Sequence, residues 1–121
     1  MDFKTTKKDD YTLIEILAEK LDTVIVPNLK AELVFISSNG EKNMIMDFSK
    51  CRYVDSSGLS AILVANRLCK SAEGTLVVLG LQSTVERLIV ISQLDSVLNI
   101  TYTMEEAEGL LKNDNKHQEK I

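Results

Sequence analysis

The residues best suited to chemistry lie together in the run Asp55-Ser56-Ser57-Gly58, which places a carboxylate, two hydroxyls and a glycine side by side. An apolar stretch of helical spacing follows, so the run is expected to open a helix. A carboxylate or hydroxyl in front of a helix accepts hydrogen bonds from the free N–H groups of its first turn. Either Asp55 or Ser56 can fill this role, and Ser56 is the expected cap because it precedes the predicted helix by one residue.

Gly58 has a cost that capping does not explain. A glycine inside the first helical turn destabilises a helix by about 1 kcal/mol relative to alanine. Without a side chain at this position, another molecule can approach the neighbouring hydroxyl and backbone closely. We therefore predict that Gly58 is kept for access to Ser57.

The rest of the sequence excludes most catalytic devices that use a serine. The only histidine, His117, lies in a polar C-terminal segment, so a Ser-His-Asp arrangement is not expected within the fold. The sequence contains no phosphate-cradling glycine loop and no G-x-S-x-G nucleophile elbow. Asp47 and Asp55 could act as an acid–base pair, but a strand-end role and a helix cap explain them better. The chain is therefore not expected to be an enzyme.

Composition sets the broad class of the protein. With 121 residues, of which 45% are hydrophobic, the chain fits one globular domain. Cys51 and Cys69 are too few for a disulfide framework or a four-cysteine zinc site and indicate a reducing compartment. The N-terminus lacks the apolar region of a signal peptide, and no apolar run approaches the roughly 18 residues of a membrane span. A cytoplasmic protein is predicted.

The net charge of −4 has a location in the sequence. Residues 82–111 carry five acids and one base, while the rest of the chain is neutral overall. A protein that binds nucleic acid directly usually has a basic patch, and none is visible here. Direct nucleic-acid binding is therefore not expected.

Hydrophobic patterning predicts strands alternating with helices. Alternation over residues 11–18 and the polar KKDD turn predict a hairpin with residues 3–6. Pro27 and Asn39-Gly40 bound a helix with an apolar stripe. Ser83 and Glu86 form a predicted capping box for another helix. The other predicted elements are strands 44–48, 76–79 and 97–102 and helices 57–72, 83–91 and 104–111.

The element order is β-β-α-β-α-β-α-β-α. Strands separated by crossover helices predict an α/β fold with a mixed sheet of about five strands and about four helices. The domain is expected to span residues 1–112. The polar residues 113–121 are expected to form a frayed tail.

At this point the sequence resembles a known family. Asp55-Ser56-Ser57-Gly58-Leu59, followed by an apolar helix, is similar to the motif of the STAS domain found in bacterial anti-sigma factor antagonists. The resemblance covers most of the chain. It includes Leu21-Asp22 with Pro27 and Leu29, the strand Met46–Ser49, and Gly74 with the strand that follows it.

The resemblance implies a regulatory switch. By match to the family, Ser57 is the residue that a partner kinase phosphorylates, and Asp22, Asp55, Ser56 and Gly58 belong to the partner interface. The implied partner is an anti-sigma factor that is also a serine protein kinase, with a phosphatase to reverse the modification. The kinase would bind ATP and Mg²⁺, so this chain needs no cofactor. Unphosphorylated protein would dock, and phosphorylated protein would be released.

One alternative from another class stays open. A STAS-type domain can bind a small ligand or nucleotide, or serve as an accessory subunit, without phosphorylation. The N-terminus of the helix that begins near Ser57 is a place where an anion could bind. Arg52 is the one basic residue close to the motif, which counts against this alternative.

Overall fold

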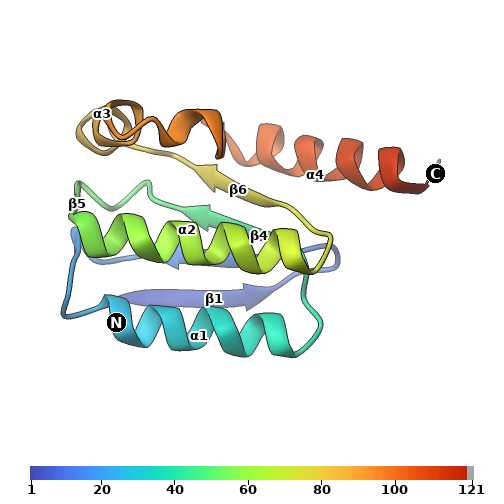
Figure 1. The fold of residues 1–121 in the computed structure, drawn as a ribbon, viewed down its shortest axis with the longest axis horizontal. Coiled ribbons are helices and arrows are strands. Elements are labelled where there is room, and N and C mark those ends of the chain that lie inside the picture. The colour runs from blue at the N-terminus through green and yellow to red at the C-terminus, as the bar shows by residue number, and fades with distance from the viewer. Residues whose placement is uncertain (120–121) are drawn as a thin grey trace.

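The computed structural model describes the backbone of residues 1–119 and the side chains of residues 1–112. A five-stranded sheet has the order β1-β2-β4-β6-β7, and a separate two-stranded sheet pairs β3 with β5 (Figure 1). The strands are β1 (Phe3–Lys7), β2 (Thr12–Ile16), β3 (Lys20–Leu21), β4 (Met44–Asp47), β5 (Tyr53–Val54), β6 (Leu76–Leu79) and β7 (Asn99–Thr101). The helices are α1 (Val26–Ser38), α2 (Ser56–Ser71), α3 (Ser83–Ile91) and α4 (Met104–Glu119), with a 3₁₀ turn η1 (Leu94–Ser96).

The sheet confirms the predicted fold class. β1 and β2 form the expected antiparallel hairpin, with Phe3 opposite Ile16. The other neighbouring pairs, β2–β4, β4–β6 and β6–β7, are all parallel. Parallel strands need crossover connections, which the helices between them supply. The result is a mixed sheet in an α/β domain.

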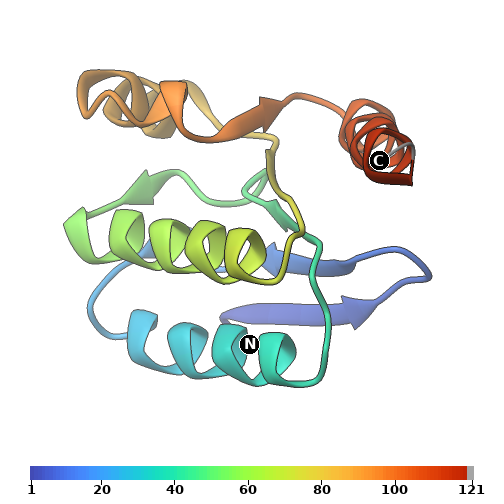
Figure 2. The same ribbon diagram turned by 45° about the vertical axis from the view of Figure 1, so that its right-hand side comes forward.

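The two faces of the sheet are covered by different helices. Because side chains alternate along a strand, Met46 and Val78 join the larger core beneath α1, α2 and α3. Ile45 and Val77 point the other way and pack against α4. Figure 2 shows α1 and α2 side by side on one side of the sheet and α4 apart from them. Burial on both faces explains why β6 and the first three residues of β4 are continuous apolar runs.

Helix α1 follows the sequence prediction closely. Its buried residues are Val26, Leu29, Leu33 and Ile36, which form the predicted stripe, and Pro27 lies in its first turn. The helix ends at a C-cap, Asn39. Gly40 follows with a φ of +89°, a conformation that glycine adopts without a steric penalty.

The structure contains a small sheet that the sequence did not predict. β3 and β5 have two residues each and pair in parallel, with Leu21 opposite Val54. Two residues are too few to show the alternation by which strands are predicted. This pairing is decided by contacts between distant segments, and it positions the motif described below.

The start of α3 and the end of α4 differ from the sequence prediction. The capping box at Ser83 is wrong: the N-cap of α3 is Gln82, and its side chain makes no capping hydrogen bond. The Glu86 carboxylate accepts the hydroxyl of Tyr102 instead. Helix α4 continues past the predicted end at residue 111 to Glu119, within the segment predicted to be a tail. The side chain of His117 lies outside the described residues.

Among the residues that the structure describes, no helix is both long and apolar enough to cross a membrane. The same residues contain no group of three or more His, Cys, Asp or Glu side chains placed to hold a metal ion.

Candidate functional site

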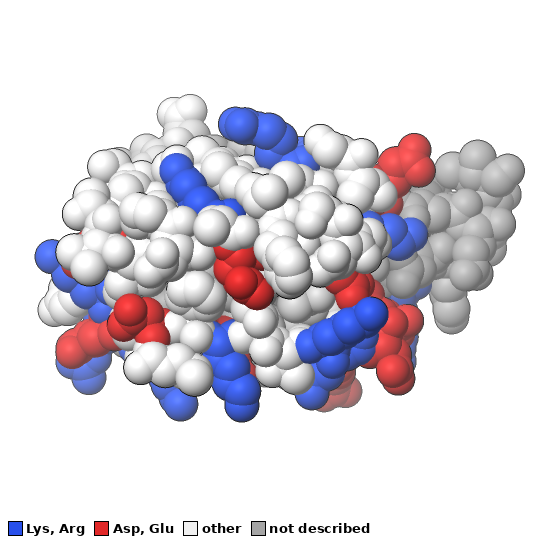
Figure 3. Space-filling view, turned by 90° about the horizontal axis from the view of Figure 1, so that it is seen from below, with Lys and Arg blue, Asp and Glu red and all other residues white. Residues whose placement is uncertain are grey.

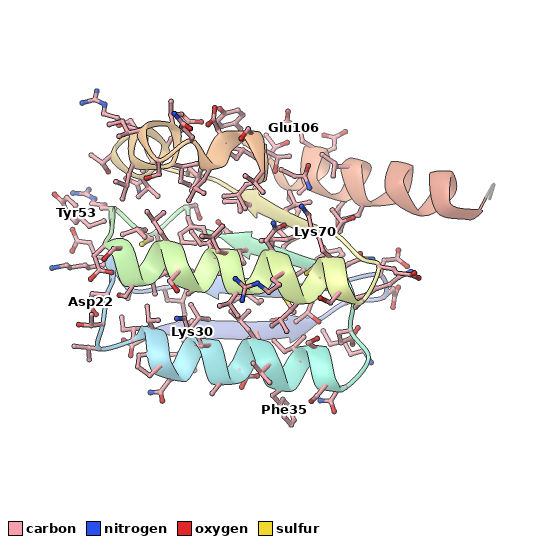
Figure 4. All side chains as sticks on the ribbon, viewed as in Figure 1. Asp22, Lys30, Phe35, Tyr53, Lys70 and Glu106 are labelled. Atoms are coloured by element: carbon pink, nitrogen blue, oxygen red, sulfur yellow. The ribbon has the colours of Figure 1, made fainter. Side chains whose placement is uncertain are left out.

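The connections that follow the parallel strands gather at one end of the sheet. β2 leads through β3 to the turn before α1, β4 leads through β5 to α2, and β6 leads directly to α3. In open α/β sheets the carboxyl ends of the strands are the usual place for binding sites, because these loops converge there. Figure 4 shows Asp22 and Tyr53 at this end, beside the start of α2.

The small β3–β5 sheet aligns the two predicted interface aspartates. Leu21 pairs with Val54, so Asp22 and Asp55 are the next residues on two neighbouring parallel strands. The Asp55 N–H donates to the carbonyl of Leu21 at 3.3 Å. Neighbouring strands lie about 4.8 Å apart, so the two residues leave the sheet side by side.

Asp55 caps helix α2. Its Oδ1 accepts the backbone N–H of Gly58 at 3.0 Å and the hydroxyl of Ser57 at 2.6 Å. These two hydrogen bonds, the Ser57 bond first, lower the pKa of Asp55, and the nearby Lys20 charge lowers it further. The prediction that Ser56 is the cap is wrong, because α2 already begins at Ser56 and the extended residue before it is Asp55.

The Ser57 hydroxyl is partly exposed and held by one carboxylate. Ser57 is half-buried, and the preceding Ser56 is exposed. A carboxylate with a lowered pKa is a weak base, so Asp55 does not make Ser57 a strong nucleophile. The arrangement orients the hydroxyl of a half-buried serine in the first turn of α2.

Gly58 has a different explanation from the one expected. It is buried, and a Cβ built at this position would lie 2.6 Å from Val54 Cγ1 and 2.9 Å from the Leu21 carbonyl oxygen. Glycine is required because β3 and β5 pass directly beneath the first turn of α2. The prediction that Gly58 gives an incoming molecule access is therefore wrong: the space is filled by the Val54 side chain and by Leu21.

The remaining acidic residues of the site stabilise turns. Asp22 is half-buried, and its Oδ1 accepts the N–H of Val24 at 3.0 Å before α1. Asp47, at the end of β4, accepts the N–H of Ser49 at 2.9 Å, the strand-end role that was predicted.

The Cys51 thiol donates to the Tyr53 carbonyl oxygen at 3.3 Å and is fully buried, which raises its pKa and makes it unreactive.

Sequence reasoning gave no role to three residues that the structure places around the starts of α2 and α3. Tyr53 precedes the motif and is 54% exposed, although it lies in a strand. The Thr84 hydroxyl donates to the Arg52 carbonyl oxygen at 2.6 Å, which joins α3 to the loop before β5. Lys30 of α1 reaches α2 and donates to the Ser60 hydroxyl at 2.9 Å. The sequence signal that could have identified Lys30 is that it is a charged residue in a helix with few charges.

The surface near α1 carries more charge at its lower edge than over the rest of the face. Figure 3 views the molecule from the α1 side and shows most Lys, Arg, Asp and Glu side chains along the lower margin, with one acidic group near the middle and two basic groups above it. Val24, Val34 and Phe35 are exposed on this side, at 80%, 52% and 60%.

A cavity of about 430 Å³ lies away from the motif, between the β1–β2 turn and α4. Tyr11 lines it and donates to the Glu108 carboxylate at 2.7 Å. Burial and this bond raise the pKa of Tyr11 to about 12. Because Ser57 and Arg52 do not line this cavity, it gives no support to a ligand site at the start of α2.

Comparison with known proteins identifies a family whose model matches most of this chain. A family model described as "STAS domain" matches residues 3–107. The protein BtrV of Bordetella bronchiseptica, whose name places it among anti-sigma factor antagonists, is 27% identical over 108 residues, covering 89% of this chain and 93% of that protein.

Solved structures share the fold. An anti-sigma-factor antagonist (STAS) domain protein from Planctomyces limnophilus superposes with a TM-score of 0.84 at 14% identity, covering 93% of this chain and 99% of that one. The Bacillus cell fate determinant SpoIIAA, solved in its phosphorylated form, has a TM-score of 0.71 at 22% identity, covering 88% and 96%.

Proposed function

The chain belongs to the STAS domain family, and on that premise we propose that it is an anti-sigma factor antagonist switched by phosphorylation of Ser57. The observation that carries the proposal is the position of the Ser57 hydroxyl. It is half-buried in the first turn of α2, hydrogen-bonded to Asp55, at the end of the sheet where the loops converge. The names of BtrV and of the STAS protein from Planctomyces limnophilus support the proposed class.

In the unphosphorylated state the protein docks on a partner through the surface around this hydroxyl. This surface includes the exposed Ser56 and Tyr53 and the Asp22 that leaves β3 beside Asp55, while Asp55 accepts the Ser57 hydroxyl. Gly58 contributes to this surface indirectly, because the close approach that it permits brings β3 and Asp22 beside α2. The proposed partner is an anti-sigma factor that is also a serine protein kinase, and docking would release its sigma factor in the cytoplasm.

Phosphorylation would reverse docking through charge. The kinase transfers the γ-phosphoryl group of ATP to Ser57: the bond from the γ-phosphorus to ADP breaks, a bond to Oγ forms, and a base on the kinase takes the hydroxyl proton. The product carries about −1.5 to −2 charges near neutral pH, next to the carboxylates of Asp22 and Asp55. Burying such a group in a partner interface is costly, so the complex dissociates. A phosphatase would hydrolyse the ester and restore docking.

The test is partner capture from native extract with two variants. Ser57→Ala should bind constitutively, and Ser57→Asp should lose binding on the order of a hundredfold, because an uncompensated like charge in an interface costs several kcal/mol. The matched control is Ser71→Asp, which adds the same charge at the exposed far end of α2. Equal binding by Ser57→Asp and the control would contradict the proposal.

The modified residue is identified separately. After incubation with the captured kinase and ATP, intact mass should show one phosphate on the wild type and none on Ser57→Ala. The matched control is Thr84→Ala, which removes the hydroxyl at the equivalent position of α3 and should leave phosphorylation unchanged. Phosphate on Ser57→Ala would place the modification elsewhere, with Ser56 the next candidate.

A further inference from the structure

The Lys30 side chain bridges α1 and α2, the helix whose first turn contains Ser57. The Lys30 ammonium, on α1, donates to the Ser60 hydroxyl of α2 at 2.9 Å. Figure 4 shows Lys30 between α1 and α2, near the end where α2 begins. The bond uses one of the three donors of the ammonium group, so at least one further donor remains for another acceptor.

Ser60 and Ser57 lie on the same flank of α2. Residues three apart on a helix are neighbours, with Cβ atoms about 5–6 Å apart. Ser57, Ser60 and Val64 are each half-buried, as expected for the side of α2 that turns toward α1. A long, flexible lysine side chain seated on Ser60 can therefore reach a group attached to Ser57 by a change of rotamer.

A phosphate on Ser57 cannot stay where the hydroxyl is now. The Ser57 Oγ lies 2.6 Å from an Asp55 carboxylate oxygen and donates its hydrogen to it. Phosphorylation replaces that hydrogen with a dianionic group, so the hydrogen bond becomes a repulsion between like charges. The side chain must turn away from Asp55, and the nearest flank that offers a positive charge on α1 is the one held by Lys30.

We propose that Lys30 is the counter-ion of phosphorylated Ser57: its ammonium leaves the Ser60 hydroxyl and pairs with the phosphate, tying α1 to α2. The inference rests on the proposed function, since it needs a phosphate on Ser57. In the unphosphorylated state the Lys30 ammonium is hydrogen-bonded to Ser60, one helical turn from Ser57. In the phosphorylated state the ion pair draws the phosphate toward α1 and offsets its repulsion from Asp55.

The test measures the phosphate directly. Phosphoserine is incorporated at position 57 during translation, so no kinase is needed, and its second ionisation, normally near pH 6, is followed by ³¹P NMR. A paired cation stabilises the dianion, so the titration midpoint should rise by about half a pH unit or more in Lys30→Met. Lys30→Arg should keep the midpoint of the wild type.

Two lysines serve as controls. Lys70→Met makes the same change of charge on α2, roughly 20 Å along the helix from Ser57 and beyond the screening length of about 8–10 Å, so it should not shift the midpoint. Lys20 lies near Asp55 and is the competing cation. A shift in Lys20→Met with none in Lys30→Met would overturn the proposal, as would equal midpoints in Lys30→Met and the wild type.

Failure of the Lys30 proposal and failure of the proposed function would give different results. If Ser57 is not the physiological phosphorylation site, the captured kinase leaves it unmodified, whereas the titration still reports whether Lys30 pairs with a phosphate there. If Lys30→Met does not fold, Lys30→Gln provides the same loss of charge with a polar side chain. Ser60→Ala frees the ammonium and should leave the midpoint unchanged or lower it, and a rise would contradict the proposed exchange.

Discussion

Helices α2 and α3 begin with similar sequences and use them differently. α2 begins after Asp55 with Ser56 and Ser57, and α3 begins after Gln82 with Ser83 and Thr84. Each therefore has an exposed serine first and a second hydroxyl next. That second hydroxyl donates at 2.6 Å in both helices, from Ser57 to the Asp55 side chain and from Thr84 to the Arg52 carbonyl oxygen.

The difference lies in what each hydroxyl is bonded to. Thr84 and the neighbouring Gln82 donate to backbone carbonyls of Arg52 and Ser49, so the start of α3 fixes the loop between β4 and β5. Ser57 donates to a charged side chain of its own helix turn, which leaves the loop independent of it. A hydroxyl bonded to the backbone of a distant segment stabilises tertiary structure, whereas one bonded to a carboxylate of its own turn can be modified without loss of a tertiary contact.

The largest expected effect concerns the third helical residue, Gly58. Gly58→Ala should destabilise the protein by about 2–3 kcal/mol, because the added Cβ overlaps Val54 and the Leu21 backbone. The measurement is the urea unfolding midpoint. The matched control is Gly109→Ala in α4, where nothing lies within 4 Å of the added Cβ and the stability should stay the same or rise. Equal effects at the two glycines would contradict the packing explanation.

A smaller effect is expected from the two second-position hydroxyls. Thr84→Val should cost about 1 kcal/mol in the free energy of unfolding, since the hydrogen bond to Arg52 joins two segments. Ser57→Ala should cost less, because Asp55 keeps its bond from the Gly58 N–H and remains solvated. Urea unfolding of both variants makes the comparison, and a larger loss in Ser57→Ala would show that the switch hydroxyl also has a structural role.

A further effect depends on pH and is confined to α2. Folding lowers the pKa of Asp55, so its charge contributes stability above the unfolded pKa and this contribution is lost as pH falls through the folded pKa. Asp55→Asn keeps a capping side chain without the charge. The variant should be less stable than the wild type at neutral pH, and the difference should shrink as pH falls from about 5 to 2. A difference that does not change with pH would rule out the charge as its cause.

The smallest effect should come from the first serines. Ser56→Ala and Ser83→Ala each change an exposed residue that is not the cap of its helix, so each should alter the free energy of unfolding by about 0.5 kcal/mol or less. A clearly larger loss for Ser56→Ala alone would revive its expected role as the cap of α2.

Much of the fold could be predicted because its elements are long and periodic. The stripe of α1, the hairpin of β1 and β2 and the buried strands β4 and β6 all show patterns that local sequence determines. The motif at Asp55 was found in the same way, since a carboxylate and hydroxyls in front of an apolar helix stand out. Its family resemblance then drew attention to Ser57.

The errors about the starts of α2 and α3 have two causes. The alternatives Asp55 and Ser56 as cap differ by a single position, and periodicity does not locate a helix end that finely. The need for glycine at position 58 depends on its contact with Leu21, and the hydrogen bond of Glu86 depends on Tyr102. Both partners are distant in sequence. Local patterns carry no information about such contacts.

By itself, therefore, the sequence determined the succession of strands and helices and the placing of a hydroxyl at the start of a buried helix. Only the tertiary structure decided that β3 pairs with β5 beneath Gly58, that Asp22 emerges beside Asp55, and that Lys30 reaches across from α1. The physical reason is that periodic burial depends on residues close together in sequence. The charges around Ser57, in contrast, come from three segments that meet only when the chain folds.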